Sequence, residues 1–266
     1  MTVSTFVHGN TIRANDIRQH YLRFGGKGQP LVLVPGIVSP AMLWEFVGQR
    51  LGQVYDVYIL DVRGRGLSET GDNLDYSLDA YAADVAGFAK AMGFGKFLMM
   101  GHSMGARIAI RTARKYGDLL SSIVLVDPPV SGPGRRPYPI PVPLPMLDKA
   151  QRGELWEATK DNSTWTEYST RIRAEWMHTC NRVAVETTYR NFHEEDIFSD
   201  LPHIKVPAAL IVAGKGGVIQ PPDVQEMQEL APKLVVEYVE SAGHMIPFED
   251  LEAFLATVGK ILGTSF

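Results

Sequence analysis

One short segment, residues 101–105 (Gly-His-Ser-Met-Gly), constrains the fold of this chain more than any other part of its sequence. The apolar run at 97–100 predicts a buried strand before it, and apolar residues at helical spacing follow it over 106–113. A serine between two glycines at a strand-to-helix corner is typical of a nucleophile elbow, where the glycines let the strand and the helix approach closely. The sequence therefore predicts that Ser103 is a nucleophile held clear of the edge of a sheet.

Apolar runs and helix-like segments alternate along most of the chain. Runs that predict strands lie at 30–36, 54–60, 97–100, 122–126, 206–214 and 234–239, after a predicted hairpin at 12–24. Amphipathic segments predict helices at 44–51, 78–92, 106–117 and 251–262. This alternation is typical of an α/β fold, so we expect a mostly parallel central sheet with helices on both faces.

The pattern changes after the predicted strand at 122–126. Eight prolines occupy the eighteen positions 128–145, and helical spacing without strand runs continues to about residue 200. Insertions at the carboxyl ends of strands are where the sites of α/β proteins lie. We therefore expect a core of residues 1–129 and 204–266 and an inserted helical cap, or lid, over 130–203.

Acyl transfer by a serine needs a base to accept its proton, a carboxylate to orient that base, and N–H donors for the oxyanion. His244 is the best candidate base of the seven histidines, because it lies in a Gly-His turn directly after the last predicted strand. Asp127 ends a buried strand at the sheet edge that also carries Ser103. The predicted oxyanion donors are the backbone N–H groups of Ile37 and Met104.

The remaining histidines suggest no role in proton transfer. His102 lies in the elbow itself, and we expect it to face away from the serine and to be structural. Polar surroundings favour surface positions for three others, His8, His20 and His193.

These motifs resemble those of the α/β-hydrolase superfamily over essentially the whole chain. Residues 35–36 (Pro-Gly) stand where that family usually has His-Gly, and 61–68 (Asp-Val-Arg-Gly-Arg-Gly-Leu-Ser) fit its D-x-R-G-x-G-x-S loop. Residues 101–105 and 243–244 fit its catalytic turns. The resemblance implies an α/β-hydrolase fold and a Ser-His-Asp triad.

One position departs from the family pattern. The usual acid follows the strand ending at Gly214 in a G-x-x-D pattern, and this chain has Gly217 at the aspartate position. The alternatives are Asp127 and Asp223, which is the first acid beyond Gly214. We expect Asp127 to be the acid, because Asp223 lies behind two prolines at the start of a helix, where an acid commonly serves as a cap.

Several longer segments resemble a narrower group, the deformylases of bacterial nicotinate degradation. They are residues 17–23, 60–68, 101–107, 125–136, 173–180, 214–219 and 242–247, and they lie in both the core and the cap. This resemblance implies hydrolysis of N-formylmaleamate to maleamate and formate without a metal or an organic cofactor. The carboxylate on the leaving side of such a substrate calls for a cationic pocket. The candidate substrate-binding residues are Arg107, Arg135, Arg136, Arg173, Trp176 and His178.

Composition argues against several kinds of partner. The net charge is −4 and the 26 basic residues are scattered, so the sequence indicates no nucleic-acid or membrane surface. Neither a signal-peptide pattern nor a run long enough to span a bilayer is present, which favours the cytoplasm. Cys180 is the single cysteine and is expected to be a small buried hydrophobe, and no Cys/His spacing resembles a zinc site. The expected partner is a small carboxylated substrate, and the sequence does not indicate an oligomeric state.

Other functions fit the same motifs. The triad alone is compatible with an esterase, a lactonase or a C–C bond hydrolase acting on another small carboxylated metabolite. The fold also serves small-molecule receptors, which complete one or few turnovers where an enzyme completes many. An epoxide or haloalkane hydrolase is disfavoured, because those proteins have an aspartate at the elbow and this chain has Ser103.

Overall fold

An eight-stranded sheet is the frame of the chain in the computed structural model, which describes residues 4–161 and 163–266. The order across the sheet is β1-β2-β4-β3-β5-β6-β7-β8. The strands are β1 (Phe6–Ala14), β2 (Ile17–Phe24), β3 (Pro30–Val34), β4 (Asp56–Leu60), β5 (Phe97–His102), β6 (Leu120–Val126), β7 (Ala208–Ala213) and β8 (Val235–Val239). Of these eight strands, seven run in one direction and β2 runs opposite to them, so the predicted mostly parallel sheet is confirmed.

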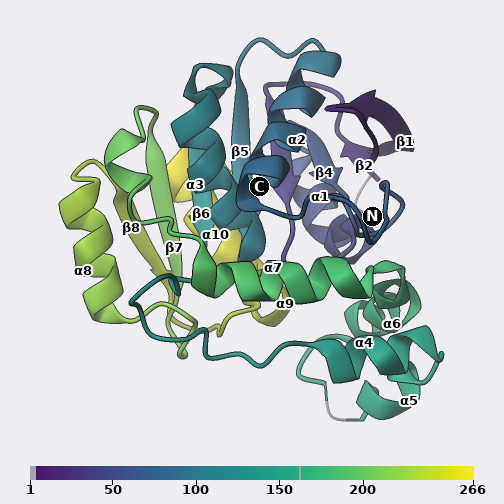
Figure 1. The fold of residues 1–266 in the computed structure, drawn as a ribbon. Helices are drawn as coiled ribbons and strands as arrows, with labels where there is room; N and C mark the ends of the chain where they lie inside the picture. The colour runs from purple at the N-terminus through teal and green to yellow at the C-terminus, as the bar shows by residue number, and fades with distance from the viewer. Residues whose placement is uncertain (1–3, 162) are drawn as a thin grey trace.

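Helices cover both faces of this sheet, as predicted (Figure 1). One face carries α2 (Leu78–Ala91), α3 (Met104–Tyr116) and α8 (Pro221–Leu230), and the other carries α1 (Glu45–Leu51), α9 (Ile246–Glu249) and α10 (Leu251–Leu262). Side chains of β3 alternate between the two apolar clusters, with Val32 and Val34 on the α3 side and Leu31 and Leu33 on the α10 side. A strand buried on both faces must be apolar throughout, which explains the continuous run in the sequence.

The segment between β6 and β7 is helical. It contains α4 (Leu144–Gln151), α5 (Leu155–Thr159), α6 (Glu167–Trp176) and α7 (Arg182–Glu194). Short 3₁₀ turns lie at Ala41–Trp44, Gly117–Leu119, Met177–Thr179 and Leu201–His203. In Figure 1, α7 crosses the lower part of the view and α4, α5 and α6 gather at its right end. We refer to residues 130–203 below as the cap segment.

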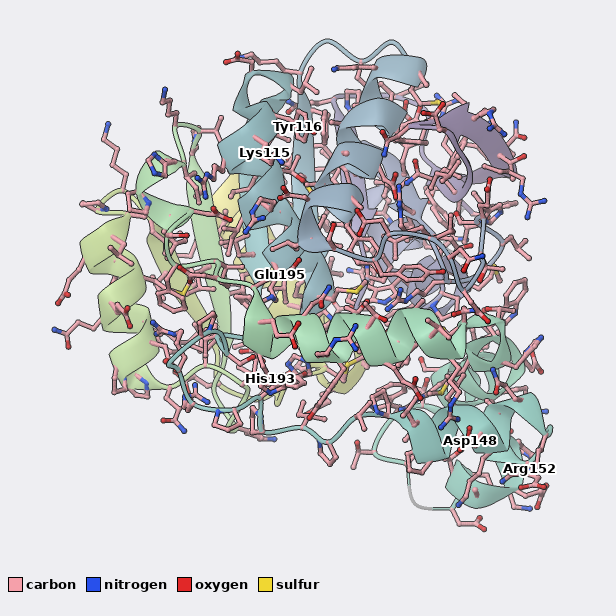
Figure 2. All side chains as sticks on the ribbon, in the orientation of Figure 1. Lys115, Tyr116, Asp148, Arg152, His193 and Glu195 are labelled. Atoms are coloured by element: carbon pink, nitrogen blue, oxygen red, sulfur yellow. The ribbon has the colours of Figure 1, made fainter. Side chains whose placement is uncertain are left out.

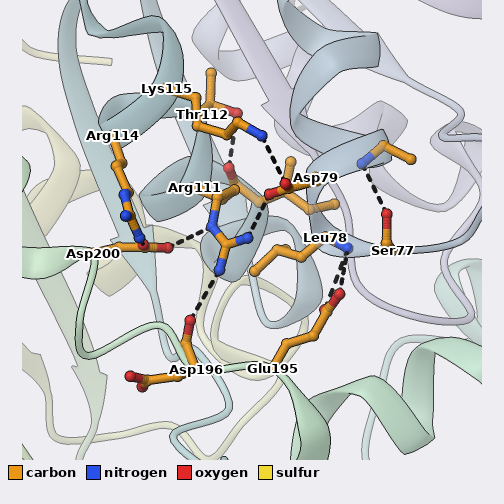
Figure 3. Close-up of polar contacts among 12 residues, drawn as sticks. Ser77, Leu78, Asp79, Arg111, Thr112, Arg114, Lys115, Glu195, Asp196 and Asp200 are labelled. Atoms are coloured by element: carbon orange, nitrogen blue, oxygen red, sulfur yellow. Dashed lines mark hydrogen bonds and ion pairs between the residues drawn. The ribbon is translucent and has the colours of Figure 1, made fainter.

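Charged side chains fix the end of the cap segment to α2 and α3 (Figure 3). Asp200 is fully buried, and it accepts a hydrogen bond from Arg111 Nε at 2.6 Å and a second from Arg114. Arg111 also pairs with Asp79, which in turn accepts from Lys115 Nζ at 2.6 Å. Because a buried charge is stable only when it is paired, these contacts determine where the chain re-enters the core.

Local signals at the chain's turns are confirmed in the structure. Asn15 and Asp16 have φ angles of 49° and 61° in the hairpin between β1 and β2. Ser77 caps α2 by accepting from the backbone N–H of Ala80.

The surface prediction for His20 is wrong: the loop that follows β4 covers it, and its Nδ1 lies 2.7 Å from Asp61 Oδ2.

Cys180 is buried, as predicted. Burial raises the pKa of its thiol to about 12, so the sulfur behaves as part of the apolar core. Among the residues that the structure describes, no helix is both long and apolar enough to span a membrane.

Candidate active site

Ser103 occupies the sharp corner between β5 and α3. Its φ of 55° lies in a region that costs a non-glycine residue of order 1–3 kcal/mol. A Cβ on Gly101 would lie 2.1 Å from the carbonyl oxygen of Gly105, and one on Gly105 would lie 1.9 Å from that of Val34. Only glycine therefore fits at these two positions, each two residues from the serine, and this close packing holds the strained corner in place.

His244 links Ser103 to Asp127 through hydrogen bonds. His244 Nε2 lies 3.1 Å from Ser103 Oγ, and His244 Nδ1 lies 2.6 Å from Asp127 Oδ2. A carboxylate only accepts, so Nδ1 carries the proton and Nε2 accepts from the serine hydroxyl. Asp223 is engaged elsewhere, accepting from the backbone N–H of Gln220 at 2.7 Å and pairing with Arg136.

A missing side chain makes room for the Asp127 carboxylate. A Cβ at Gly217 would lie 2.5 Å from Asp127 Oδ2. The neighbouring backbone N–H of Val218 donates to the same oxygen at 3.2 Å. Asp127 itself has a φ of 45°, a positive value that few non-glycine residues adopt. Position 217 is where the family usually has its acid. Because this chain has a glycine there, the Asp127 carboxylate has room beside it.

His102 supports the main chain of His244. Its Nε2 lies 2.8 Å from the His244 carbonyl oxygen, which only accepts, so Nε2 is the donor. Burial and the nearby His244 lower the pKa of His102 to about 3, which keeps the ring neutral. The ring also packs against Trp44, with 5.1 Å between centroids. The hydrogen bond from His102 Nε2 therefore helps to hold the main chain of His244 in place.

The loop after β3 carries Ile37, whose position depends on a buried arginine. Arg65 Nε donates to the Ile37 carbonyl oxygen at 3.0 Å, and the same guanidinium binds Tyr81 Oη at 2.5 Å and Thr188 Oγ1 at 3.0 Å. Met104 is the first residue of α3, where a backbone N–H has no intrahelical acceptor. Sequence analysis missed Arg65, and its only signal was its place between two glycines of the 61–68 loop.

Ser103 opens into a cavity of about 650 Å³ between the core and the cap segment. Core residues on its wall include Ile37, Ser39, Ser103 and His244, and cap residues include Tyr138, Met146, Leu155, Trp165, Arg173 and Tyr189. The wall is mostly apolar, with few polar groups. A pocket of this kind is suited to a small organic molecule oriented by a few polar contacts.

Arg173 is the predicted arginine that reaches this cavity. Its guanidinium lies 4.7 Å from the ring centre of Trp165 and beside Met146 Sδ. Burial lowers the pKa of Arg173 to about 10, so the group remains cationic at neutral pH. Among the described residues no carboxylate forms an ion pair with it, which leaves its positive charge available to a ligand.

The other predicted arginines have partners outside the cavity. Arg107 donates to the carbonyl oxygens of Pro129 and Ser131, each at 2.8 Å, and of Glu195 at 2.6 Å. Arg135 forms a two-bond pair with Glu226, and Arg136 pairs with Asp223. Trp176 is absent from the cavity wall, and His178 is exposed and lines a separate hollow on the cap segment.

Tyr138 is a cavity residue that sequence analysis missed. Its Oη lies 3.4 Å from His244 Nε2. Its backbone N–H donates to His193 Nε2 at 3.2 Å, so His193, predicted to be a surface residue, is partly buried and anchors this loop. Figure 2 labels His193 and Glu195 at the C-terminal end of α7. Tyr138 gave no sequence signal because it lies in an irregular proline-rich stretch.

Comparisons with known proteins cover both the core and the cap segment. Residues 31–257 match the Alpha/beta hydrolase family. N-formylmaleamate deformylase of Pseudomonas putida is 52% identical over 264 residues, which is 98% of each chain. A crystal structure of N-formylmaleamic acid deformylase from Pseudomonas putida S16 has a TM-score of 0.91 and 49% identity, covering 94% of this chain and 100% of that one. 2-(Acetamidomethylene)succinate hydrolase of Mesorhizobium japonicum is 34% identical over 40% of this chain and 38% of its own.

Proposed function

The chain belongs to the alpha/beta hydrolase family, and we propose that it is a serine hydrolase that cleaves N-formylmaleamate to maleamate and formate. The observation that carries this proposal is the likeness to the Pseudomonas putida deformylase over 98% of both chains, because it includes the cap segment as well as the core. We further propose that residues 130–203 form a cap over a core of residues 1–129 and 204–266. The cytoplasmic location and the absence of a cofactor remain predictions.

In the proposed first half-reaction, Ser103 Oγ attacks the formyl carbon while His244 Nε2 accepts its proton. The 3.1 Å separation of these two atoms supports direct transfer. The oxyanion binds the backbone N–H groups of Ile37 and Met104, each donor being worth roughly 3 kcal/mol. Asp127 stabilises the imidazolium through its 2.6 Å contact with Nδ1. The C–N bond then breaks, its electron pair goes to nitrogen, and His244 returns the proton there.

In the second half-reaction, water hydrolyses the formyl-serine. His244 accepts a proton from the water molecule, and the resulting hydroxide attacks the formyl carbon. Collapse of the second tetrahedral intermediate breaks the bond to Ser103 Oγ, which recovers a proton from His244. Formate leaves, and the enzyme is ready for another molecule.

The carboxylate of the substrate is proposed to bind Arg173. This guanidinium is cationic, lies on the wall of the cavity that contains Ser103, and has no acidic partner among the described residues. The formyl group is too small to supply much binding energy, so the leaving side of the substrate must provide discrimination. Arg107, Arg135 and Arg136 are not proposed for this role, because their donors are engaged elsewhere.

The proposal is tested by supplying the purified protein with N-formylmaleamate beside a panel of p-nitrophenyl esters and lactones. We expect formate and maleamate in equal amounts over many turnovers, with a specificity constant at least about 100-fold above that of the best panel member. A lactone or ester hydrolysed faster than N-formylmaleamate would assign the protein to another activity of the same fold. One or few turnovers would instead indicate a receptor.

A further inference from the structure

Tyr138 lies directly beside the two atoms that exchange the proton. Its Oη is 3.4 Å from His244 Nε2. The ring is held edge-on to Phe192, with 5.3 Å between centroids. The backbone is fixed through the N–H bond to His193. The hydroxyl is therefore presented to the reaction centre by a well-packed ring.

The Tyr138 hydroxyl is a donor without a strong acceptor. Burial raises the pKa of Tyr138 above its ordinary value, so the phenol keeps its proton throughout the neutral range. Its 3.4 Å contact with His244 Nε2 is long, and that nitrogen already accepts from Ser103. A donor with only a long contact forms a stronger hydrogen bond when a better acceptor comes within reach. A substrate atom beside His244 Nε2 could be that acceptor.

The geometry of the reaction identifies the substrate atom. The formyl oxygen is assigned to the Ile37 and Met104 N–H groups, whereas His244 Nε2 must face the leaving nitrogen. Tyr138 Oη lies 3.4 Å from Nε2, so a leaving group that receives its proton from Nε2 comes within reach of this hydroxyl. We propose that Tyr138 is a catalytic residue that donates a hydrogen bond to the leaving amide during C–N cleavage, an inference that rests on the proposed function.

The chemistry requires no proton from Tyr138 itself. When the C–N bond breaks, the electron pair on nitrogen is shared with the neighbouring carbonyl oxygen of the leaving amide. His244 Nε2 delivers the proton to nitrogen, and Tyr138 donates a hydrogen bond to that carbonyl oxygen while keeping its own proton. Because negative charge on the oxygen is greatest during bond breaking, this bond stabilises the transition state more than the bound substrate.

Two substrates that form the same formyl-serine separate this role from packing. Tyr138→Phe retains the ring and removes the hydroxyl. With N-formylmaleamate we expect kcat to fall roughly 100-fold and KM to change less than 3-fold. With p-nitrophenyl formate we expect less than a 3-fold change, since nitrophenolate leaves readily without a donor.

Tyr189→Phe is the matched control. Tyr189 also lies on the cavity wall, but its hydroxyl donates to the carbonyl oxygen of Ile140 at 3.1 Å. This variant should change the rates with both substrates by the same factor. Rates are expressed per active serine, counted from the nitrophenolate burst, so that a partly folded sample does not imitate a slower enzyme.

The outcomes are distinguishable. A loss confined to the amide substrate supports the proposal. An equal loss with both substrates makes Tyr138 a packing residue, and an unchanged amide rate means that the hydroxyl is not used; either result overturns it. If the wild-type protein releases no formate from N-formylmaleamate, the proposed function fails and the Tyr138 proposal fails with it.

Discussion

Two regions present different kinds of polar group to the same cavity. One is the set of carboxyl ends of the strands, called the sheet edge below, and the other is the cap segment. At the sheet edge, Ser103, His244 and Asp127 are already bonded to one another. In the cap segment, Arg173 has no acidic partner among the described residues, and Tyr138 has only a long contact. The members of the first group are linked to one another before substrate arrives, whereas the second group has bonding capacity that faces the cavity and that a ligand can use.

Backbone conformation separates the two regions in the same way. Ser103 and Asp127 both have positive φ angles, at 55° and 45°. Within the described cap segment, positive φ occurs only at the glycines Gly134 and Gly153. Of these two regions, only the one that contains Ser103 and Asp127 has non-glycine residues with positive φ among the described residues, and the cap groups are carried on relaxed backbone. We expect mutations at the sheet edge to reduce rate and mutations in the cap segment to reduce selectivity.

The largest effect should come from Ser103→Ala, which removes the proposed nucleophile. Formate release should fall by a factor of about 10⁴ or more, because no other group forms the acyl-enzyme. Calorimetry should still detect N-formylmaleamate binding, since the cap groups are unchanged. Ser39→Ala removes another hydroxyl from the same cavity wall and should cost less than about 10-fold. If Ser103→Ala retained more than about a hundredth of the wild-type rate of formate release, Ser103 would not be the nucleophile.

A somewhat smaller loss is expected for Asp127→Asn. An amide cannot stabilise the imidazolium and favours the wrong tautomer of His244, so kcat should fall by roughly 10³ to 10⁴ with the fold intact. Asp223→Asn is the control, because that carboxylate binds the backbone of Gln220 rather than His244. Initial rates measure the loss of activity, and circular dichroism checks that both variants are folded. Equal losses of kcat in the two folded variants would contradict the assignment of the acid.

In the cap segment, Arg173→Gln should reduce kcat/KM for N-formylmaleamate by roughly 100-fold, mostly through KM. A charge-assisted bond is worth about 1.5–3 kcal/mol, which sets this scale. Formamides without a carboxylate should be affected much less. Arg171→Gln on the same helix is the control, since its guanidinium lies over Trp156 on the outer hollow. Equal losses with charged and neutral formamides would show that Arg173 does not read the carboxylate.

The smallest effect on rate should come from Asp200→Asn, where the cap segment rejoins the core. Losing the buried carboxylate removes the partner of Arg114 and one of the two acidic partners of Arg111, so the free energy of unfolding should fall by about 3 kcal/mol in urea titrations. The kcat of folded enzyme should change less than 2-fold. The control Glu226→Gln removes a more exposed partner of Arg135 and should cost at most about 1 kcal/mol. A large rate loss in Asp200→Asn would mean that this junction also shapes the site.

Sequence predicted the sheet edge far better than the cap segment, and the reason is physical. A strand, a strained turn and a helix leave a local pattern, so the corner at Ser103 was visible within a few residues. Asp127 could be singled out because Gly217 lacks the usual carboxylate. The surface position assigned to His20 was wrong because its cover, the loop at 61–68, lies more than forty residues away.

Partners of the arginines could not be ranked from sequence. Arg135 pairs with Glu226, 91 positions away, and Arg107 binds Glu195, 88 positions away. Whether a guanidinium is free for a ligand depends on such distant contacts, which composition and spacing do not contain. The same limit applies to Tyr138, which lies beside His244 although the two residues are 106 positions apart in the sequence.

The contact between Gly217 and Asp127 also makes these two positions interdependent in sequence change. A side chain at 217 would occupy the space of the Asp127 carboxylate, with its Cβ 2.5 Å from Oδ2. An aspartate at 217 therefore conflicts with one at 127, because its Cβ alone would overlap the Asp127 carboxylate. Gly217→Asp alone would bring two carboxylates into conflict, and loss of the Asp127 carboxylate alone would leave His244 without an acid. Each single substitution toward the more usual arrangement is therefore expected to be harmful. The location of the acid can change only through paired substitutions, which is strong sign epistasis between two residues 90 positions apart.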